Sequence, residues 1–92
     1  MTMSLNDALA EVIRSRIESR GMTMASLARV SGVSRESIRN YIQRGRTMPI
    51  DVLAELAPGL GLTAYELVKL AQDLRDARDL GQNRDDPEGL HA

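Results

Sequence analysis

Apolar residues recur along the chain at intervals of three and four positions, the spacing that places them on one face of an α-helix. The clearest stripe, in residues 5–20, consists of Leu5, Leu9, Val12, Ile13 and Ile17. Ser4 stands where it can cap this helix, and Gly21 stands where it can end it. Every periodic segment has the helical spacing, and none alternates in the manner of a strand. The sequence therefore predicts an all-α protein.

Two short helices are predicted next, over residues 23–30 and about 34–43. Gly32 lies between them and can adopt a backbone conformation that other residues avoid. Ser34 can cap the second of the two helices, and Gly45 fits its C-terminal boundary. Two helices joined by a short turn that contains glycine are the signature of a helix-turn-helix.

A fourth helix is expected to open at Thr47 and Pro49, because proline is favoured in a first turn. Pro58-Gly59 is expected to stop it, because a proline there removes a backbone donor. The predicted buried side of this helix consists of Ile50, Leu53, Leu56 and Ala57.

A fifth helix begins with the capping box "TAYEL", residues 63–67, and is predicted to run to about residue 79. Its apolar positions continue beyond what closing a small domain requires, which favours a homodimer contact over packing against the first helix. These dimerisation candidates are Leu67, Leu70, Leu74 and Ala77. Residues 1–80 are thus expected to form one domain, and the polar residues 81–92 a disordered tail.

The charge of the chain is unevenly distributed, although the formal net charge is only −1. Residues 1–20 carry three arginines and three acidic residues. Residues 21–48 carry five arginines against one glutamate, a net charge of +4, whereas residues 49–92 carry four bases against nine acids, a net charge of −5. A basic segment between a neutral and an acidic one indicates a local anion-binding surface, and this segment contains the predicted helix-turn-helix.

The composition argues against several classes of function. The chain has no cysteine, and its one histidine is His91, so a cysteine-based zinc site or a Ser-His-Asp triad is not expected. No apolar run approaches the roughly 20 residues that cross a bilayer, and the N-terminus lacks a signal-peptide pattern. We therefore expect a cytoplasmic protein that is not an enzyme, does not enter membranes and needs neither metal nor cofactor.

The outer face of the predicted third helix carries side chains that can read bases, while Ile38, Tyr41 and Ile42 point to the core. Arginine can donate two hydrogen bonds to guanine, asparagine can bond adenine at two positions, and glutamate can accept from cytosine. For Glu36 an ion pair with Arg39 is an equal alternative. The candidates for base contacts are Arg35, Glu36, Arg39 and Asn40.

A second set of polar residues is suited to phosphate groups. The N–H groups at the start of a helix bind phosphate, and hydroxyl side chains there add to them. Basic residues that follow a recognition helix lie where a loop would run along the DNA backbone. The candidates for phosphate contacts are Thr23, Ser34, Gln43, Arg44 and Arg46.

Residues 23–61, "TMASLARVSGVSRESIRNYIQRGRTMPIDVLAELAPGLG", resemble the lambda-repressor/Cro-like (XRE-type) helix-turn-helix family. The matching pieces are "LA" at 27–28, "SGVS" at 31–34, Ile38, Gly45, Pro49 and the run "LAELA…LGL". With the first and fifth helices, the resemblance covers roughly residues 5–75. It implies a compact five-helix DNA-binding domain that usually binds a palindromic site as a dimer, with the third helix in the major groove.

Carried over by position, the resemblance implies that Arg35, Glu36 and Asn40 face bases. It places nearer to phosphates, or to bases at the edge of the site, Ser34, Arg39, Arg44 and Arg46. The chain departs from the family pattern in two places. Met24 stands where the family often has a phosphate-binding glutamine, and the segment from Ile38 to Gly45 is one residue longer, either in the third helix or in the loop after it.

The sequence thus predicts a sequence-specific DNA-binding transcription regulator, most simply a phage, prophage or bacterial repressor bound as a dimer to a palindromic operator. The alternative is an antitoxin of a toxin–antitoxin module, which neutralises a toxin and represses its own operon. The acidic C-terminal half offers a surface to a basic protein partner in that case. Co-purification of a small basic protein would favour the antitoxin.

Overall fold

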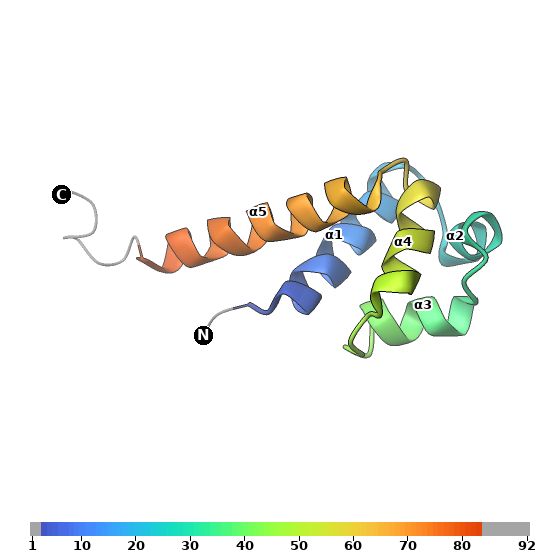
Figure 1. The fold of residues 1–92 in the computed structure, drawn as a ribbon, viewed down its shortest axis with the longest axis horizontal. Coiled ribbons are helices and arrows are strands. Elements are labelled where there is room, and N and C mark those ends of the chain that lie inside the picture. The colour runs from blue at the N-terminus through green and yellow to red at the C-terminus, as the bar shows by residue number, and fades with distance from the viewer. Residues whose placement is uncertain (1–2, 84–92) are drawn as a thin grey trace.

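The computed structural model describes residues 3–83, and this part of the chain consists of five α-helices without a strand (Figure 1). The helices are α1 (Leu5–Ser19), α2 (Met24–Ser31), α3 (Arg35–Ile42), α4 (Ile50–Gly59) and α5 (Ala64–Asn83). The all-α, five-helix prediction is confirmed. Residues 81–83, predicted to belong to a tail, form the last turn of α5, and the rest of that predicted tail lies outside the described residues.

α1 occupies the middle of the fold. It runs antiparallel to α5 and also packs against α3, while α2 packs against α3 and α4 (Figure 1). Every helix contributes to one apolar core, whose largest fully buried side chains are Ile13, Leu27, Ile38, Leu56, Leu60 and Leu67. Burying such a side chain stabilises the fold by about 1.5–3 kcal/mol. The helix-turn-helix is therefore held by residues from all five helices.

The helix ends predicted from capping residues are present. The Ser4 hydroxyl accepts a hydrogen bond of 3.0 Å from the Asp7 N–H at the start of α1. At the start of α5, the Thr63 hydroxyl accepts from the Glu66 N–H at 3.0 Å, and the Glu66 carboxylate accepts from the Thr63 N–H at 2.9 Å. These bonds satisfy N–H groups that have no partner within the helix.

The end of α4 corrects the prediction that Pro58-Gly59 stops this helix, because both residues lie inside it. A proline in the last turn loses one hydrogen bond and crowds the carbonyl four residues earlier, but no further turns depend on it. Gly59 is the last helical residue, and the chain leaves the helix two residues later, where Gly61 has a φ of +76° and the Leu62 N–H bonds the Ala57 carbonyl at 2.9 Å. This is the left-handed glycine cap of a Schellman motif.

Gly59 has a packing role instead. A Cβ atom at this position would lie 3.0 Å from methyl groups of Leu27 and Val30, both in α2. Only glycine therefore permits the observed approach of α4 to α2 without a shift of these side chains.

Ile50 is a second correction within α4, because 77% of its side chain is exposed, although it was predicted to be buried. The other three residues predicted for the buried side, Leu53, Leu56 and Ala57, lie in the core. Ile50 is the first residue of the helix and lies at the edge of the apolar stripe. Its side chain therefore projects beyond the neighbours that cover the rest of the stripe.

α5 extends past the N-terminal end of α1, away from the other three helices (Figure 1). Leu67 is fully buried in the core, so its prediction as a dimerisation residue is wrong. Leu74 is half-buried and packs against the core. By contrast, Ala77 is exposed, and the exposed fractions of Leu70 and Leu80 are 38% and 61%.

Candidate DNA-binding interface

α2 and α3 form a helix-turn-helix with a short, well-defined turn. Gly32 ends α2 with a φ of +81°, and the Ser34 hydroxyl caps α3 by accepting from the Ser37 N–H at 3.1 Å. Leu27 of α2 and Ile38 of α3 are both fully buried, so apolar contacts fix the angle between the two helices. The turn predicted at Gly32 is confirmed.

α1 holds the C-terminal end of α3 through a side chain that the sequence did not single out. The Arg14 guanidinium donates to the Ile42 carbonyl at 2.6 Å, and Ile42 is the last residue of α3. A helix leaves its final carbonyl groups without partners, and a cation there is favourable. Arg14 and Ile42 are 28 positions apart, so no local pattern marks the pair.

Asn6 fixes the loop that follows α3 in a similar way. Its amide nitrogen donates to the Arg46 carbonyl at 3.1 Å, and its amide oxygen accepts from the Met48 N–H at 2.9 Å. One side chain at the start of α1 therefore ties down the backbone on both sides of Thr47. The sequence gives no sign of this role either, because the partners are about 40 positions away.

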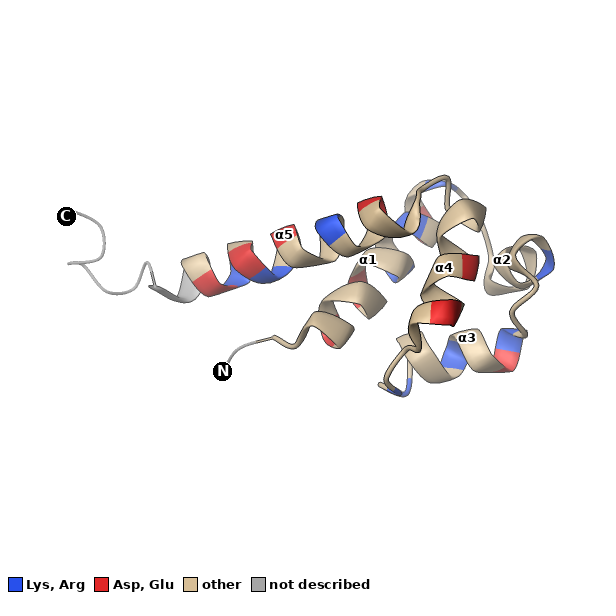
Figure 2. Cartoon of the chain, in the orientation of Figure 1, with Lys and Arg blue, Asp and Glu red and all other residues tan. Residues whose placement is uncertain are grey.

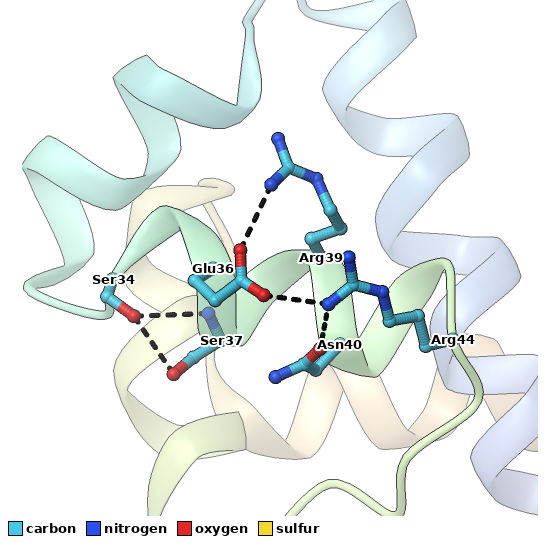
Figure 3. A network of polar contacts seen from close by, with 6 residues as sticks. All are labelled: Ser34, Glu36, Ser37, Arg39, Asn40 and Arg44. Carbon is cyan, nitrogen blue, oxygen red and sulfur yellow. Dashed lines mark hydrogen bonds and ion pairs between the residues drawn. The ribbon is translucent and has the colours of Figure 1, made fainter.

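Three of the four candidates for base contacts lie together on one side of α3, where Arg44 joins them from the loop (Figure 3). Arg44 Nη1 lies 2.7 Å from a carboxylate oxygen of Glu36 and 2.7 Å from the amide oxygen of Asn40. Arg39 Nη1 lies 3.1 Å from the other carboxylate oxygen of Glu36. The ion pair of Glu36 with Arg39, one of its two interpretations, is therefore present in this structure.

These arginines favour the charged form of Glu36. The hydrogen bond and the positive charge of Arg44, and to a lesser degree Arg39, hold the pKa of the Glu36 carboxyl below its usual value. The carboxylate is therefore charged at neutral pH. Because arginine only donates, the bond from Arg44 also identifies which end of the Asn40 amide is oxygen. The Asn40 amino group is left to donate elsewhere.

The other candidates have different surroundings. Arg35 is exposed on the first turn of α3, and its side chain forms no ion pair within residues 3–83. Gln43 is the exposed cap residue of α3, and Arg46 is exposed in the following loop. Thr23 lies at the start of α2, where its hydroxyl accepts from the Ser26 N–H at 3.0 Å. The hydroxyls of Thr23 and Ser34 are thus both used in capping.

The segment from Ile38 to Gly45 continues beyond the end of α3. α3 ends at Ile42, and the chain then makes a wide turn in which the Arg44 N–H bonds the Arg39 carbonyl at 3.2 Å. Gly45 has a φ of +74°. This turn directs the Arg44 side chain back along α3, which explains how it reaches Glu36 and Asn40.

Charge is unevenly placed on the molecule. Figure 2 shows mostly basic residues on α3 and the loop after it, acidic residues on α4, and residues of both signs along α5. Within residues 3–83, no cluster of acidic or histidine residues is arranged to hold a metal ion. None of the helices in that range has an apolar stretch long enough to cross a bilayer.

Two helices that pack together across a short glycine turn, with the second helix capped and its outer face exposed, define the class of helix-turn-helix domains. The chain belongs to the helix-turn-helix family, of the XRE type, whose family model matches residues 13–72. The matched segment ends within α5. A comparison with curated protein sequences finds no match.

Two solved structures share the fold. The clp gene regulator ClgR from Corynebacterium glutamicum is 20% identical, with a TM-score of 0.78 over 90% of this chain and 88% of that chain. A mutant of the restriction-modification controller protein C.Esp1396I is 23% identical, with a TM-score of 0.69 over 79% of this chain and 92% of that chain. The predicted family and fold are confirmed.

Proposed function

We propose that this protein is a sequence-specific DNA-binding transcription regulator whose α3 enters the major groove. The observation that carries the proposal is the outer face of α3, which presents Arg35, Glu36 and Asn40. Buried Ile38 and Ile42 anchor the opposite face of the helix in the core. A rigidly anchored helix with donors and acceptors on its free face has the form that base readout requires. Membership of the helix-turn-helix family supports the same assignment.

The residues around α3 divide between bases and backbone in this proposal. Arg35, on the first turn of α3 and without an ion-pair partner within residues 3–83, is placed to bond a guanine with two donors. Asn40 presents its amino group to a base acceptor. Arg46 and Gln43, beyond the last turn of α3, and Thr23, at the start of α2, lie near phosphates.

Repression by occupancy is the simplest mode of regulation for such a domain, and we propose that two copies bind a palindromic operator. The support for a dimer is exposed apolar surface along α5, formed by Leu70 beside Arg16 of α1 and by Ala77 and Leu80 nearer the end of the helix. A two-fold interface uses the same patch on both copies, so one exposed helix side is sufficient to form it.

In vitro selection of binding sites from random duplexes tests the proposal. We expect enriched sites with inverted-repeat symmetry, whose half-sites are centred about 34–36 Å apart, one turn of the duplex. Enrichment of sites without that symmetry would contradict the dimer. A protein that enriches no sequence at all would contradict specific recognition by α3.

A further inference from the structure

Glu36 is the one acidic residue in the basic segment 21–48, and it lies on the face proposed to meet DNA. Its side chain is 61% exposed, so no packing requirement explains a carboxylate there. A negative charge at this place repels the phosphate backbone. A base contact is one explanation for a carboxylate on this face, and it leaves room for a second that concerns DNA of any sequence.

The contacts of Glu36 suggest this second explanation. Its two carboxylate oxygens engage Arg39 at 3.1 Å and Arg44 at 2.7 Å (Figure 3). Each arginine directs a donor at the carboxylate. Because the carboxylate cancels one of the two guanidinium charges, the cluster of Glu36, Arg39 and Arg44 has a net charge of +1. Phosphates of any sequence are attracted less strongly by these arginines than by free ones.

We propose that Glu36 determines specificity by restraining Arg39 and Arg44, so that it weakens binding to DNA in general more than binding to the target site. The proposal rests on the function proposed above. Non-specific affinity comes almost entirely from charge, whereas specific affinity adds base contacts that the restraint leaves in place. A protein discriminates better between two partners when its binding to the unwanted partner is weakened.

The same carboxylate identifies the kind of base that it tolerates. A carboxylate offers about four lone-pair positions, and the two arginines use two of them. An amino group in the major groove, on cytosine N4 or adenine N6, can donate to a remaining position. Guanine O6 and N7 and thymine O4 are acceptors and would be repelled. We therefore place an amino-bearing base edge opposite Glu36 in the target site.

Glu36→Gln tests the proposal because it removes the charge and keeps the shape of an exposed side chain. We expect affinity for random duplex to rise roughly three- to tenfold, and the salt dependence to steepen by about one phosphate. Affinity for the selected operator should rise less, so the ratio of the two affinities should fall. Glu18→Gln, an exposed residue of α1, removes the same charge elsewhere and should leave the ratio unchanged.

An unchanged random-duplex affinity, or an equal rise for both duplexes, would overturn the role of Glu36 while leaving the regulator function intact. The regulator function fails on a different result, namely a wild-type protein that binds neither duplex. The two proposals can therefore be distinguished in one set of titrations.

A double-mutant cycle then tests the restraint of Arg44 itself. In the wild-type background, Arg44→Gln should lower random-duplex affinity by a smaller factor than in the Glu36→Gln background, because Glu36 already competes with phosphate for the Arg44 guanidinium. In the Glu36→Gln background, the same change should cost about threefold or more, because Arg44 is then free to contact phosphate. Equal losses in the two backgrounds would show that Glu36 does not restrain Arg44, and would overturn the mechanism.

Discussion

Arg35 and Arg46 carry the same charge but differ in their relation to α3. Arg35 lies on the first turn of the helix, the end that meets base edges when a recognition helix enters the groove. Arg46 lies in the loop after the helix, with its backbone bonded to Asn40 and to Asn6. The first position is suited to reading a base and the second to contacting the DNA backbone.

Substitution of these two arginines should therefore have different consequences. We expect Arg35→Ala to lower affinity for the selected operator by about 1–3 kcal/mol and to relax preference at one base pair. Arg46→Ala should weaken all sequences alike and reduce the salt slope by about one. Lys69→Ala, on α5, removes the same charge as a control. Fluorescence anisotropy titrations that show operator preference unaffected by Arg35→Ala would contradict the assignment.

Asn6 should contribute to stability more than an exposed asparagine usually does. Asn6→Ala removes the acceptor of the partly buried Met48 N–H, and we expect a loss of about 1–2 kcal/mol in the free energy of unfolding. Asn6→Asp keeps an acceptor for that N–H but loses the donor to Arg46, so it should cost less. Urea denaturation measures the free energy of unfolding of both variants. If the two variants lose equal stability, the hydrogen bond from the Met48 N–H is not the main contribution of Asn6.

At the scale of residues, the sequence predicted what depends on local spacing. Glu36 and Arg39 are three positions apart on a helix, so their ion pair was one of two stated interpretations. The approach of Arg44 was not predictable, because it depends on the wide turn after Ile42. The roles of Arg14 and Asn6 were missed because their partners belong to distant parts of the chain.

At the scale of elements, periodicity and capping residues placed all five helices, and the errors lie where packing or a later cap overrides a local rule. Pro58 lies within the last turn of α4 instead of after it, and the left-handed glycine that follows the C-cap is Gly61. Leu67 has the same spacing as Leu70 and Leu74, yet it alone of the three is fully buried. The helical spacing of the apolar residues shows which of them share a face of α5. It does not show how much of that face a neighbouring helix covers.

The exposed side of α5 leads to a prediction about assembly. Leu80→Asp places a charge in the proposed interface, and we expect sedimentation velocity to show a shift from dimer to monomer. Leu80 is preferable to Leu74, whose half-buried side chain belongs to the core. Ile50→Asp introduces the same charge at an exposed apolar residue of α4 and should leave the dimer intact. If Ile50→Asp alone dissociates the dimer, the interface lies on the surface around α4 instead.

At the scale of the whole molecule, the sequence pI of about 5.8 conceals an uneven distribution of positive and negative charge. α3 and its following loop carry mostly basic residues, α4 carries acidic residues, and α5 carries both signs (Figure 2). In the proposed complex, the arginines of α3 and its loop are the charges that attract the phosphates. The charge of the segments was readable in the sequence, but their separation in space required the fold.

A dimer joined through α5 would fix the distance and the relative rotation of its two α3 helices, which makes operator spacing a test of the complete assembly. Insertion of five base pairs between the half-sites turns one of them to the opposite side of the duplex. We expect affinity to fall roughly 100-fold, because only one protomer can then bind its half-site. The same five base pairs placed beside the operator should have no effect. The Leu80→Asp variant should bind the operators with and without the insertion with similar affinity, which is weaker than that of the wild type for the intact operator. If the insertion leaves the affinity of the wild-type protein unchanged, its protomers bind independently.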